Sequence, residues 1–292
     1  MRRILLFLLN RLGFFLPDKA FLKMKYWLSM GEKLDLDSPK TYTAKINWLK
    51  LYDRDSNYTL MVDKYRVKKL VAEKIGKQYI IPTLGFWTSP KDIDFDSLPD
   101  KFVLKCNHNS GIGMCICTDK SKLDLTKVKK GLRKGLRQNY YLQSREWPYR
   151  NVKRGILAEQ YMCDEVTGEL RDYKFFCFDG KVRGLFVATG RSRGDHETRF
   201  DFFDPDYNHL PFTNGHPNAD TIPEKPIRFD EMKRVASKLS EGIPAVRVDL
   251  YEIDGRVYFG ELTFSHWGGF MPFCPKEWDS IFGEWIVLPD KD

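Results

Sequence analysis

The hydrophobic and polar positions of the chain follow two different periods. Up to residue 76, apolar side chains recur every three or four positions, which is typical of helices that bury one face. We expect helices over 17–30, 43–51 and 58–75. From residue 101 the alternation has a period of two, which predicts strands. The expected strands are 79–81 before this change and 102–106, 114–118, 155–161, 172–178, 181–189, 245–253 and 257–264 after it.

Two helical stretches interrupt the predicted strands, at 125–136 and 230–239, and Asp230 is a suitable N-cap for the second. Asp-Gly pairs at 179–180 and 254–255 indicate tight hairpin turns. No internal repeat is evident. The pattern therefore predicts an α+β protein in which helices lie against antiparallel sheets.

Composition narrows the class of protein. The chain has 292 residues, enough for roughly two domains, and 42% of them are hydrophobic, which excludes disordered and fibrous classes. Six irregularly spaced cysteines without a Cys-x-x-Cys pair indicate reduced thiols, not a disulfide framework or a zinc site. The five histidines show no metal-ligand spacing either. The net charge of +8 favours an anionic partner such as lipid, nucleotide or acidic glycan.

The N-terminal segment combines arginines with an apolar run. The run over 4–9 ends at Asn10 and Arg11, so it is too short for a spanning helix and lacks the cleavage site of a signal peptide. Two interpretations remain open at this point. Residues 1–16 form either a basic amphipathic helix on a membrane surface or a helix packed on the protein itself.

Lys105 ends an apolar strand and is followed by a loop of small polar residues and glycines, 107–113. Backbone N–H groups of such a loop can surround phosphates while the lysine supplies a positive charge. The alternative is an ordinary hairpin with a lysine facing water.

The strand over 155–161 ends in a carboxylate, an amide and an aromatic residue, and backbone amides at this position can pair with an adenine edge. On the next strand, Asp172 and Lys174 share one face, where the lysine can meet a phosphate. A polar strand end and a simple ion pair, respectively, are the alternatives.

The hairpin over 246–264 carries the strongest signal. With a strict two-residue turn, Asp249 and Glu261 point to opposite sides of the sheet. A three-residue loop with a glycine bulge restores the parity and puts Arg247, Asp249, Glu261 and Thr263 on one face. Adjacent carboxylates repel unless a cation lies between them, which suits Mg²⁺ held together with phosphate oxygens. A solvated hairpin face is the alternative.

Taken in order, these pieces resemble the ATP-grasp superfamily, and more narrowly its TupA-like branch, which is associated with bacterial surface polysaccharides. The resemblance rests on Asp63-Lys64, Lys105, Ser110–Gly113, Glu159–Met162, Arg247-Val248-Asp249 and Glu261-Leu262-Thr263 for the superfamily, and on 39–41, 48–52, 63–65, 146–149, 172–174 and 260–264 for the branch.

The resemblance implies an α+β ATP-grasp fold that holds the nucleotide between two antiparallel-sheet subdomains, with a helical segment at the N-terminus. The implied divisions are an N-terminal helical segment over 1–56, a linking helix-strand subdomain over 57–100, a small subdomain over 101–162 and a large subdomain with the metal-binding hairpin over 163–292.

The resemblance also implies ATP and Mg²⁺ as cofactors and assigns residues to them. Asp249, Glu261 and Thr263 would hold the metal, although Thr263 stands where the superfamily usually has asparagine, which would weaken or remove a second metal. Arg247 and Lys174 would be catalytic. The residues implied to bind the nucleotide are Lys64, Lys105, Ser110, Gly111, Gly113, Glu159, Gln160, Tyr161, Met162, Asp164 or Glu165, and Asp172.

The implied activity is an ATP-dependent carboxylate–amine ligase that forms an amide through an acyl phosphate on a surface polysaccharide or its precursor. Its partners would be an acidic glycan or lipid-linked saccharide and an amine, for which an amino acid is one candidate, with no role for nucleic acid. The expected location is the cytoplasm, with residues 1–16 contacting the inner face of the membrane. The alternatives are a glycosyl or phosphoryl transferase of polysaccharide assembly and a non-catalytic protein that binds polyanions.

Overall fold

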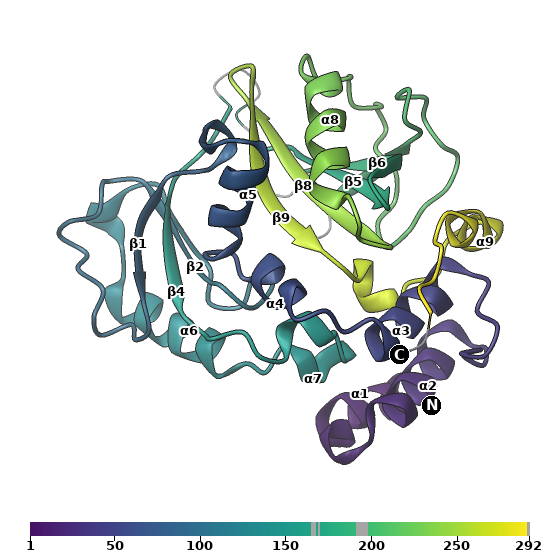
Figure 1. Cartoon of the computed structure of the whole chain (residues 1–292). Coiled ribbons are helices and arrows are strands. Elements are labelled where there is room, and N and C mark those ends of the chain that lie inside the picture. The colour runs from purple at the N-terminus through teal and green to yellow at the C-terminus, as the bar shows by residue number, and fades with distance from the viewer. Residues whose placement is uncertain (165–167, 169, 191–197, 291–292) are drawn as a thin grey trace.

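The computed structural model describes residues 1–164, 168, 170–190 and 198–290. Two antiparallel sheets dominate this part of the chain, one on each side of the view in Figure 1. The smaller sheet has the order β1-β4-β2-β3 and the larger the order β7-β6-β5-β8-β9. Their strands are β1 (Thr83–Trp87), β2 (Phe102–Cys106), β3 (Cys115–Cys117), β4 (Ile156–Gln160), β5 (Asp172–Phe178), β6 (Lys181–Thr189), β7 (Arg199–Phe203), β8 (Val246–Ile253) and β9 (Arg256–Thr263).

The helices cover the faces of these sheets, and α8 lies along the larger one in Figure 1. They are α1 (Arg2–Leu12), α2 (Asp18–Met30), α3 (Tyr42–Tyr52), α4 (Asn57–Val62), α5 (Val67–Ile75), α6 (Leu125–Arg137), α7 (Tyr141–Ser144), α8 (Phe229–Ser240) and α9 (Glu277–Glu284), with short 3-10 turns that include η4 (Trp147–Tyr149) and η6 (His266–Gly269).

Strand β5 is buried along its whole length because both faces of the larger sheet are covered. Its odd-numbered side chains, such as Phe175, join α5 and α8 in one core. The even-numbered Phe176 and Phe178 join α2, α3 and α9 in another. Asp172 and Lys174 share this second face, since side chains alternate along a strand. The polar positions of β5 therefore lie on the face that the N-terminal helices cover.

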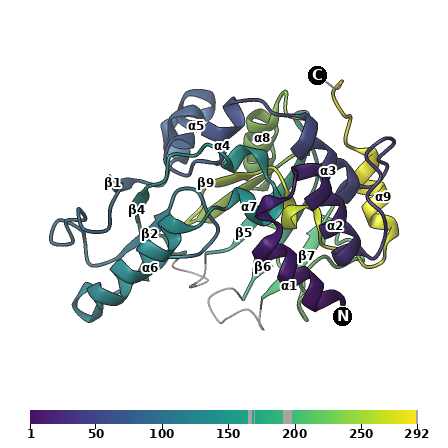
Figure 2. The same ribbon diagram turned by 90° about the horizontal axis from the view of Figure 1, so that it is seen from below.

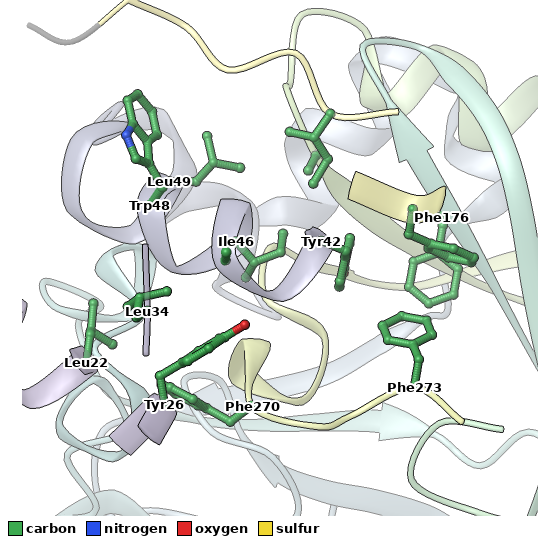
Figure 3. Packing of buried hydrophobic residues seen from close by; sticks show 14 of the residues in the cluster. Leu22, Tyr26, Leu34, Tyr42, Ile46, Trp48, Leu49, Phe176, Phe270 and Phe273 are labelled. Carbon is green, nitrogen blue, oxygen red and sulfur yellow. The ribbon is translucent and has the colours of Figure 1, made fainter. Parts of the chain in front are cut away.

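The N-terminal helices pack on the larger sheet through aromatic side chains. Tyr42 of α3 meets Phe176 edge-on, with 6.2 Å between the ring centroids, and Phe273 borders the same contact (Figure 3). Tyr26 of α2 exchanges a 2.9 Å hydrogen bond with Thr43. Helix α1 packs less closely, and Leu9 is its one buried side chain.

The smaller sheet forms a third core with α6. Strand β1 pairs with β4, so part of the stretch that we predicted as a link over 57–100 contributes to this sheet. The strand predicted over 79–81 is wrong, because residues 77–79 form a 3-10 turn and the strand begins at Thr83, after Pro82. Pro82 has no N–H for a sheet, and β1 starts where pairing becomes feasible. The proposed domain limits stay a prediction.

The helix predicted over 58–75 is two helices with a break at 63–66. Asp63 has an extended backbone, and its carboxylate accepts hydrogen bonds from the N–H groups of Tyr65 and Arg66 at 3.0 and 3.1 Å. It thereby stabilises the turn over 64–66 that leads into α5. Lys64 lies in the break, and its N–H donates to the Asn107 carbonyl, which brings it to the loop after β2.

Several smaller expectations also differ from the structure. Helix α8 begins at Phe229 after Arg228, so Asp230 lies in the first turn and is not the N-cap. Strand β7 and helix α9 were not predicted, since each is short and lies in a stretch rich in Gly, Pro and polar residues.

Candidate functional site

The hairpin β8–β9 brings its polar residues to one face by a route that differs from the prediction. The turn is a strict two-residue turn, in which Asp254 and Gly255 have φ of 50° and 69°. The register instead shifts at Gly260, which is left without a partner, so Asp249 pairs with Glu261. A Cβ at Gly260 would lie 3.0 Å from the Asp249 carbonyl oxygen, so glycine suits this bulge. The bulge therefore places Asp249 and Glu261 on the same face of the hairpin.

Asp249 is the centre of a buried ion cluster on this face. Arg247 donates to both of its carboxylate oxygens, Nε to Oδ1 at 2.6 Å and Nη2 to Oδ2 at 2.7 Å. Lys174 of β5 contacts the same carboxylate, and its Nζ lies 3.4 Å from Asp172 Oδ1. Burial lowers the pKa of Lys174, and the charge of Asp249 opposes that effect. Both oxygens of Asp249 therefore have cationic partners.

Glu261 is the more accessible carboxylate of the pair, with 32% of its side chain exposed against 1% for Asp249. Its Oε2 lies 3.0 Å from Lys64 Nζ, and its Oε1 accepts a 3.2 Å hydrogen bond from the Thr263 hydroxyl. Burial alone would raise the pKa of Glu261, but Lys64, Lys174 and Arg247 outweigh burial and hold it well below the usual value. Glu261 is consequently an ionised carboxylate that is paired with the flexible side chain of Lys64.

His266 and Asn214 hold Arg247 from the other side. Arginine only donates, so the 2.7 Å contact from Nη1 makes His266 Nδ1 an acceptor, and Nε2–H donates to Asn214 Oδ1 at 3.0 Å. The Asn214 amide nitrogen donates to the carbonyls of Met271 and Pro272, which fixes its orientation. Burial, followed by the charges of Arg247 and Lys174, keeps the pKa of His266 well below its usual value. This histidine is neutral and orients the guanidinium.

A second ion cluster lies on the smaller sheet. Glu159 of β4 contacts Lys105 of β2, and its other oxygen lies 2.6 Å from Lys68 Nζ of α5. Burial would raise the pKa of Glu159, but the two lysines outweigh burial and hold it below the usual value. Two cations share one carboxylate here, so this cluster carries a surplus positive charge.

The loop after β2 is fixed by hydrogen bonds of a buried asparagine. Asn109 donates to the carbonyls of Ile112 and Gly135, and Gly111 and Gly113 have φ of 79° and 83°, a region that favours glycine. Gly113 has no room for a side chain, since a Cβ would lie 2.8 Å from the Gly131 carbonyl oxygen. Ser110, at the tip, is exposed.

One cavity of about 630 Å³ joins the hairpin to the loop and to the helical part of the chain. Of the residues predicted from sequence, it is lined by Lys64, Ser110, Lys174, Arg247, Glu261 and Thr263. Asp249 and Asp172 lie beneath it as partners of Lys174. Lys105 and Glu159 do not line it and form their own cluster on the neighbouring sheet.

The segment predicted to bind adenine and ribose follows β4. Gln160 is exposed at the end of the strand and donates its N–H to the Pro82 carbonyl, and Tyr161 and Met162 are half-buried. Asp164 accepts a 3.1 Å hydrogen bond from the N–H of Asp254 in the hairpin turn. Glu165 lies outside the described residues.

The oxygen donors of the hairpin fit a magnesium ion that binds together with a nucleotide. Two facing carboxylates and the Thr263 hydroxyl are hard ligands of the kind that Mg²⁺ takes, and it usually completes its shell with phosphate oxygens and water. Within the described ranges no group of three or more His, Cys, Asp or Glu side chains could hold a metal ion. Phosphate would have to supply the remaining ligands and draw Lys64 away from Glu261.

Several residues of the cavity and of the smaller-sheet cluster were not predicted from the sequence. Lys68 of the smaller-sheet cluster lies four positions after Lys64, and within the single helix predicted over 58–75 this spacing was a usable signal. Glu146 lies in the stretch 146–149, which supported only the resemblance to the TupA-like branch. It is buried in the cavity wall, where burial raises its pKa. Lys25 of α2 also lines the cavity, and no local pattern marks it.

The fold and site together have the arrangement of an ATP-grasp protein: two antiparallel sheets, each with a lysine–carboxylate cluster, beside a Gly-containing loop. The chain matches the family described as TupA-like ATPgrasp over residues 44–287. It therefore belongs to the TupA-like ATP-grasp family, and the predicted fold class is confirmed. No curated protein matches the chain.

Solved structures that resemble the chain include D-alanine–D-alanine ligase from Bacillus anthracis complexed with ATP, with 16% identity, a TM-score of 0.41, and coverage of 70% of this chain and 54% of that chain. The ligase of the same name from Helicobacter pylori has 14% identity, a TM-score of 0.43, and coverage of 85% and 69%. The ATP-grasp ligase PsnB complexed with minimal precursor has 10% identity, a TM-score of 0.43, and coverage of 78% and 61%. The chain thus spans little more than half of the first of these ligases.

The predicted membrane contact concerns α1 and the turn after it. No helix in the described part of the chain has the length and apolar character needed to cross a bilayer. On α1 and the following turn, Ile4, Phe7 and Phe15 are 65%, 60% and 80% exposed. The segment is also tied to the protein, because the buried Arg145 donates to the carbonyl of Gly13 at 2.8 Å.

Proposed function

We propose that the protein is an ATP-dependent carboxylate–amine ligase. The observation that carries this proposal is the cavity itself, which joins Lys64 and Ser110 to Arg247 and Glu261. Lysine and loop N–H groups suit the phosphates of a nucleotide, the carboxylates suit its magnesium ion, and a guanidinium suits a transferring phosphoryl group. Family membership supports the same class of chemistry.

The proposed reaction has two steps. A carboxylate oxygen of the acid substrate attacks the γ-phosphorus of ATP, the bond to the leaving ADP breaks, and an acyl phosphate forms. The amine then attacks the acyl carbon, phosphate leaves with the bonding electrons, and the nitrogen loses a proton to give the amide. Arg247 would stabilise charge on the phosphoryl oxygens, held in place by Asp249 and His266. Magnesium, held by Asp249, Glu261 and Thr263, would neutralise phosphate charge.

For the acid substrate we propose a bacterial surface polysaccharide or its lipid-linked precursor, and for the second substrate an amine such as an amino acid. The net charge of +8 and the family support an acidic glycan. Aromatic side chains from Tyr140, Tyr149, Phe186 and Trp267 also line the cavity, and such rings offer flat apolar surfaces to a sugar.

The test is ADP release from MgATP with panels of uronic acids and amino acids. The proposal predicts ADP and phosphate only when an acid and an amine are both present. Turnover that requires a sugar nucleotide instead would identify a transferase, and binding of polyanions without any turnover would identify a non-catalytic protein. Either result contradicts the ligase.

We further propose that residues 1–16 dock the enzyme on the inner face of an anionic membrane, where a lipid-linked substrate would lie. Three arginines and no acidic residue occur in this segment, and its exposed side chains are large and apolar. Each basic residue near such a surface contributes about 1 kcal/mol, an effect that salt screens. The segment lies at the edge of the molecule, away from the two sheets (Figure 1).

Substitution tests this docking better than deletion, because deletion would remove the Gly13 carbonyl that Arg145 uses. Replacing Phe7, Phe14 and Phe15 by serine should abolish sedimentation with anionic vesicles and leave the melting temperature within about 2 °C. Sedimentation equal to that of the unaltered protein would contradict the proposal.

A further inference from the structure

Lys25 projects from α2 to the cavity, although α2 belongs to neither sheet. Its Nζ donates to the carbonyl of Gln143 at 2.5 Å and lies 4.9 Å from the centre of the Phe270 ring. In Figure 2, α2 lies with α3 and α9 at one side of the molecule, and the hydrogen bond of Lys25 links it to α7. The Phe270 ring itself belongs to the core beside Tyr26 (Figure 3). Lys25 is therefore held in place at the cavity wall.

The other lysine and arginine side chains of the cavity, Lys64, Lys174 and Arg247, each form an ion pair with Asp249 or Glu261. Among the residues that the structure describes, Lys25 is the cavity lysine with no carboxylate at ion-pair distance. An ammonium group has three N–H donors, and the Gln143 carbonyl accepts from one of them. The remaining donors suit an oxyanion that enters the cavity.

Burial makes the charge of Lys25 costly in the absence of a ligand. Burial lowers the pKa of Lys25 to about 8, Glu146 counteracts this, and the nearby Arg145 adds to it. The buried Lys50 lies on the same Phe270 ring at 4.3 Å, and burial lowers its pKa to about 7. An incoming carboxylate would offset the cost of burying the Lys25 charge and raise its pKa.

Lys25 lies outside the stretch that matches the family, which begins at residue 44. The site residues that the family resemblance implied lie within that stretch. Lys25 thus reaches the cavity from outside the matched stretch, and such a residue suits the choice of substrate better than the shared chemistry of phosphoryl transfer.

We propose that Lys25 binds a carboxylate of the substrate, one that is not itself activated, and so selects for acidic substrates. This inference rests on the proposed ligase function. The carboxylate belongs either to the acid or to the amine substrate, and both sources have the same recognition chemistry. Kinetic constants for the two substrates tell them apart.

The first experiment needs no turnover. Competitive labelling of the full chain with acetic anhydride between pH 6 and 10, read by peptide mass spectrometry, measures the pKa of Lys25. We expect a value near 8 without ligand and a rise of about one unit with saturating digalacturonate or L-glutamate, each of which has two carboxylates. If neither probe changes the pKa of Lys25 or its labelling, the proposal is overturned, whether or not the protein is a ligase.

The second experiment uses an acid and amine pair found by ADP release. Lys25→Met should raise the KM of one of these substrates about tenfold, while the Kd of MgATP changes less than twofold. Lys25→Arg should restore most of the affinity, which separates loss of charge from loss of folding. Lys23→Met, an exposed lysine of the same helix, is the matched control and should behave as the unaltered protein.

The pH profile completes the test. Because the charged form of Lys25 binds the carboxylate, the KM of the selected substrate should rise above about pH 8, and this rise should be absent in Lys25→Met. The substrate whose KM responds identifies which partner carries the carboxylate. An unchanged KM and profile in Lys25→Met would overturn the proposal, whereas absence of ADP release from the unaltered protein would contradict the ligase function alone.

Discussion

The two lysine–carboxylate clusters, one on the hairpin and one on the smaller sheet, differ in their balance of positive and negative charges. On the hairpin side, Lys64, Lys174 and Arg247 meet Asp172, Asp249 and Glu261, so three cations face three carboxylates. On the smaller sheet, Lys68 and Lys105 share Glu159 alone. At the second cluster a phosphate can bind Lys105 without displacing a partner, whereas Lys68 also donates to the Ile81 carbonyl and the Thr83 hydroxyl. At the first cluster a cation must exchange partners before a metal binds. We propose that the smaller sheet attracts the nucleotide and that the hairpin controls the reacting phosphate.

The largest effect on activity is expected from a substitution in the hairpin cluster. Arg247→Lys keeps the charge but loses the fork that contacts Asp249, so it should lower kcat about a hundredfold with the Kd of MgATP near that of the unaltered protein. Arg256→Lys, at an exposed position of β9, is the control. Loss of ATP affinity in proportion to turnover would mean that Arg247 acts in binding.

Removing the one carboxylate of the smaller-sheet cluster should lower the stability of the protein. Glu159→Gln leaves two lysines facing each other and should lower the free energy of unfolding by about 2–3 kcal/mol at pH 7. MgATP should restore more stability to this variant than to the unaltered protein, because phosphate replaces the lost carboxylate. Urea unfolding with and without MgATP measures both effects. The exposed pair of Lys69 and Glu73 supplies a control, and Glu73→Gln should cost less than about 0.5 kcal/mol.

The same variant has a pH signature. The folded-state pKa of Glu159 lies below its ordinary value of 4.5, so its stabilisation is present above that pH and is lost as the pH falls through the folded-state pKa. The difference in unfolding free energy between Glu159→Gln and the unaltered protein should therefore shrink in acid. A difference that stays constant down to pH 3 would show that the carboxylate is not paired with the lysines.

The smallest effect is expected from the groups that orient Arg247. His266→Asn places an amide oxygen close to the position of Nδ1 and keeps an acceptor for Arg247, whereas His266→Phe removes it. We expect kcat to fall about tenfold in the phenylalanine variant and about threefold or less in the asparagine variant, with similar melting temperatures. Equal losses in both variants would show that the ring packs in the core and does not orient the guanidinium.

Much of the hairpin could be predicted from sequence because its information is local. Alternation along β5, β8 and β9 sets which side chains share a face, and Gly260 offers the residue type that a bulge needs. The position of the bulge was wrong, because parity can be restored at the turn or within the strand and both choices fit the same spacing.

The helical side of the cavity could not be predicted in this way. Lys25 and Glu146 line the same cavity, and Lys25 reaches it through a hydrogen bond to the Gln143 carbonyl, 118 residues further along the chain. Such contacts between distant parts of the chain leave no local pattern. Likewise, the Asp63 carboxylate stabilises a turn between α4 and α5 by accepting hydrogen bonds from the N–H groups of Tyr65 and Arg66, and apolar periodicity does not reveal this break.

Calorimetric titration with MgATP tests most directly the central claim that both clusters bind one nucleotide. The unaltered protein should bind one molecule per chain. Lys105→Ala, on the smaller sheet, deletes a charge-assisted contact worth about 1.5–3 kcal/mol and should weaken this binding at least tenfold. Glu261→Gln, on the hairpin, should weaken it in the presence of magnesium and much less in its absence. Unchanged affinity in either variant would contradict the claim.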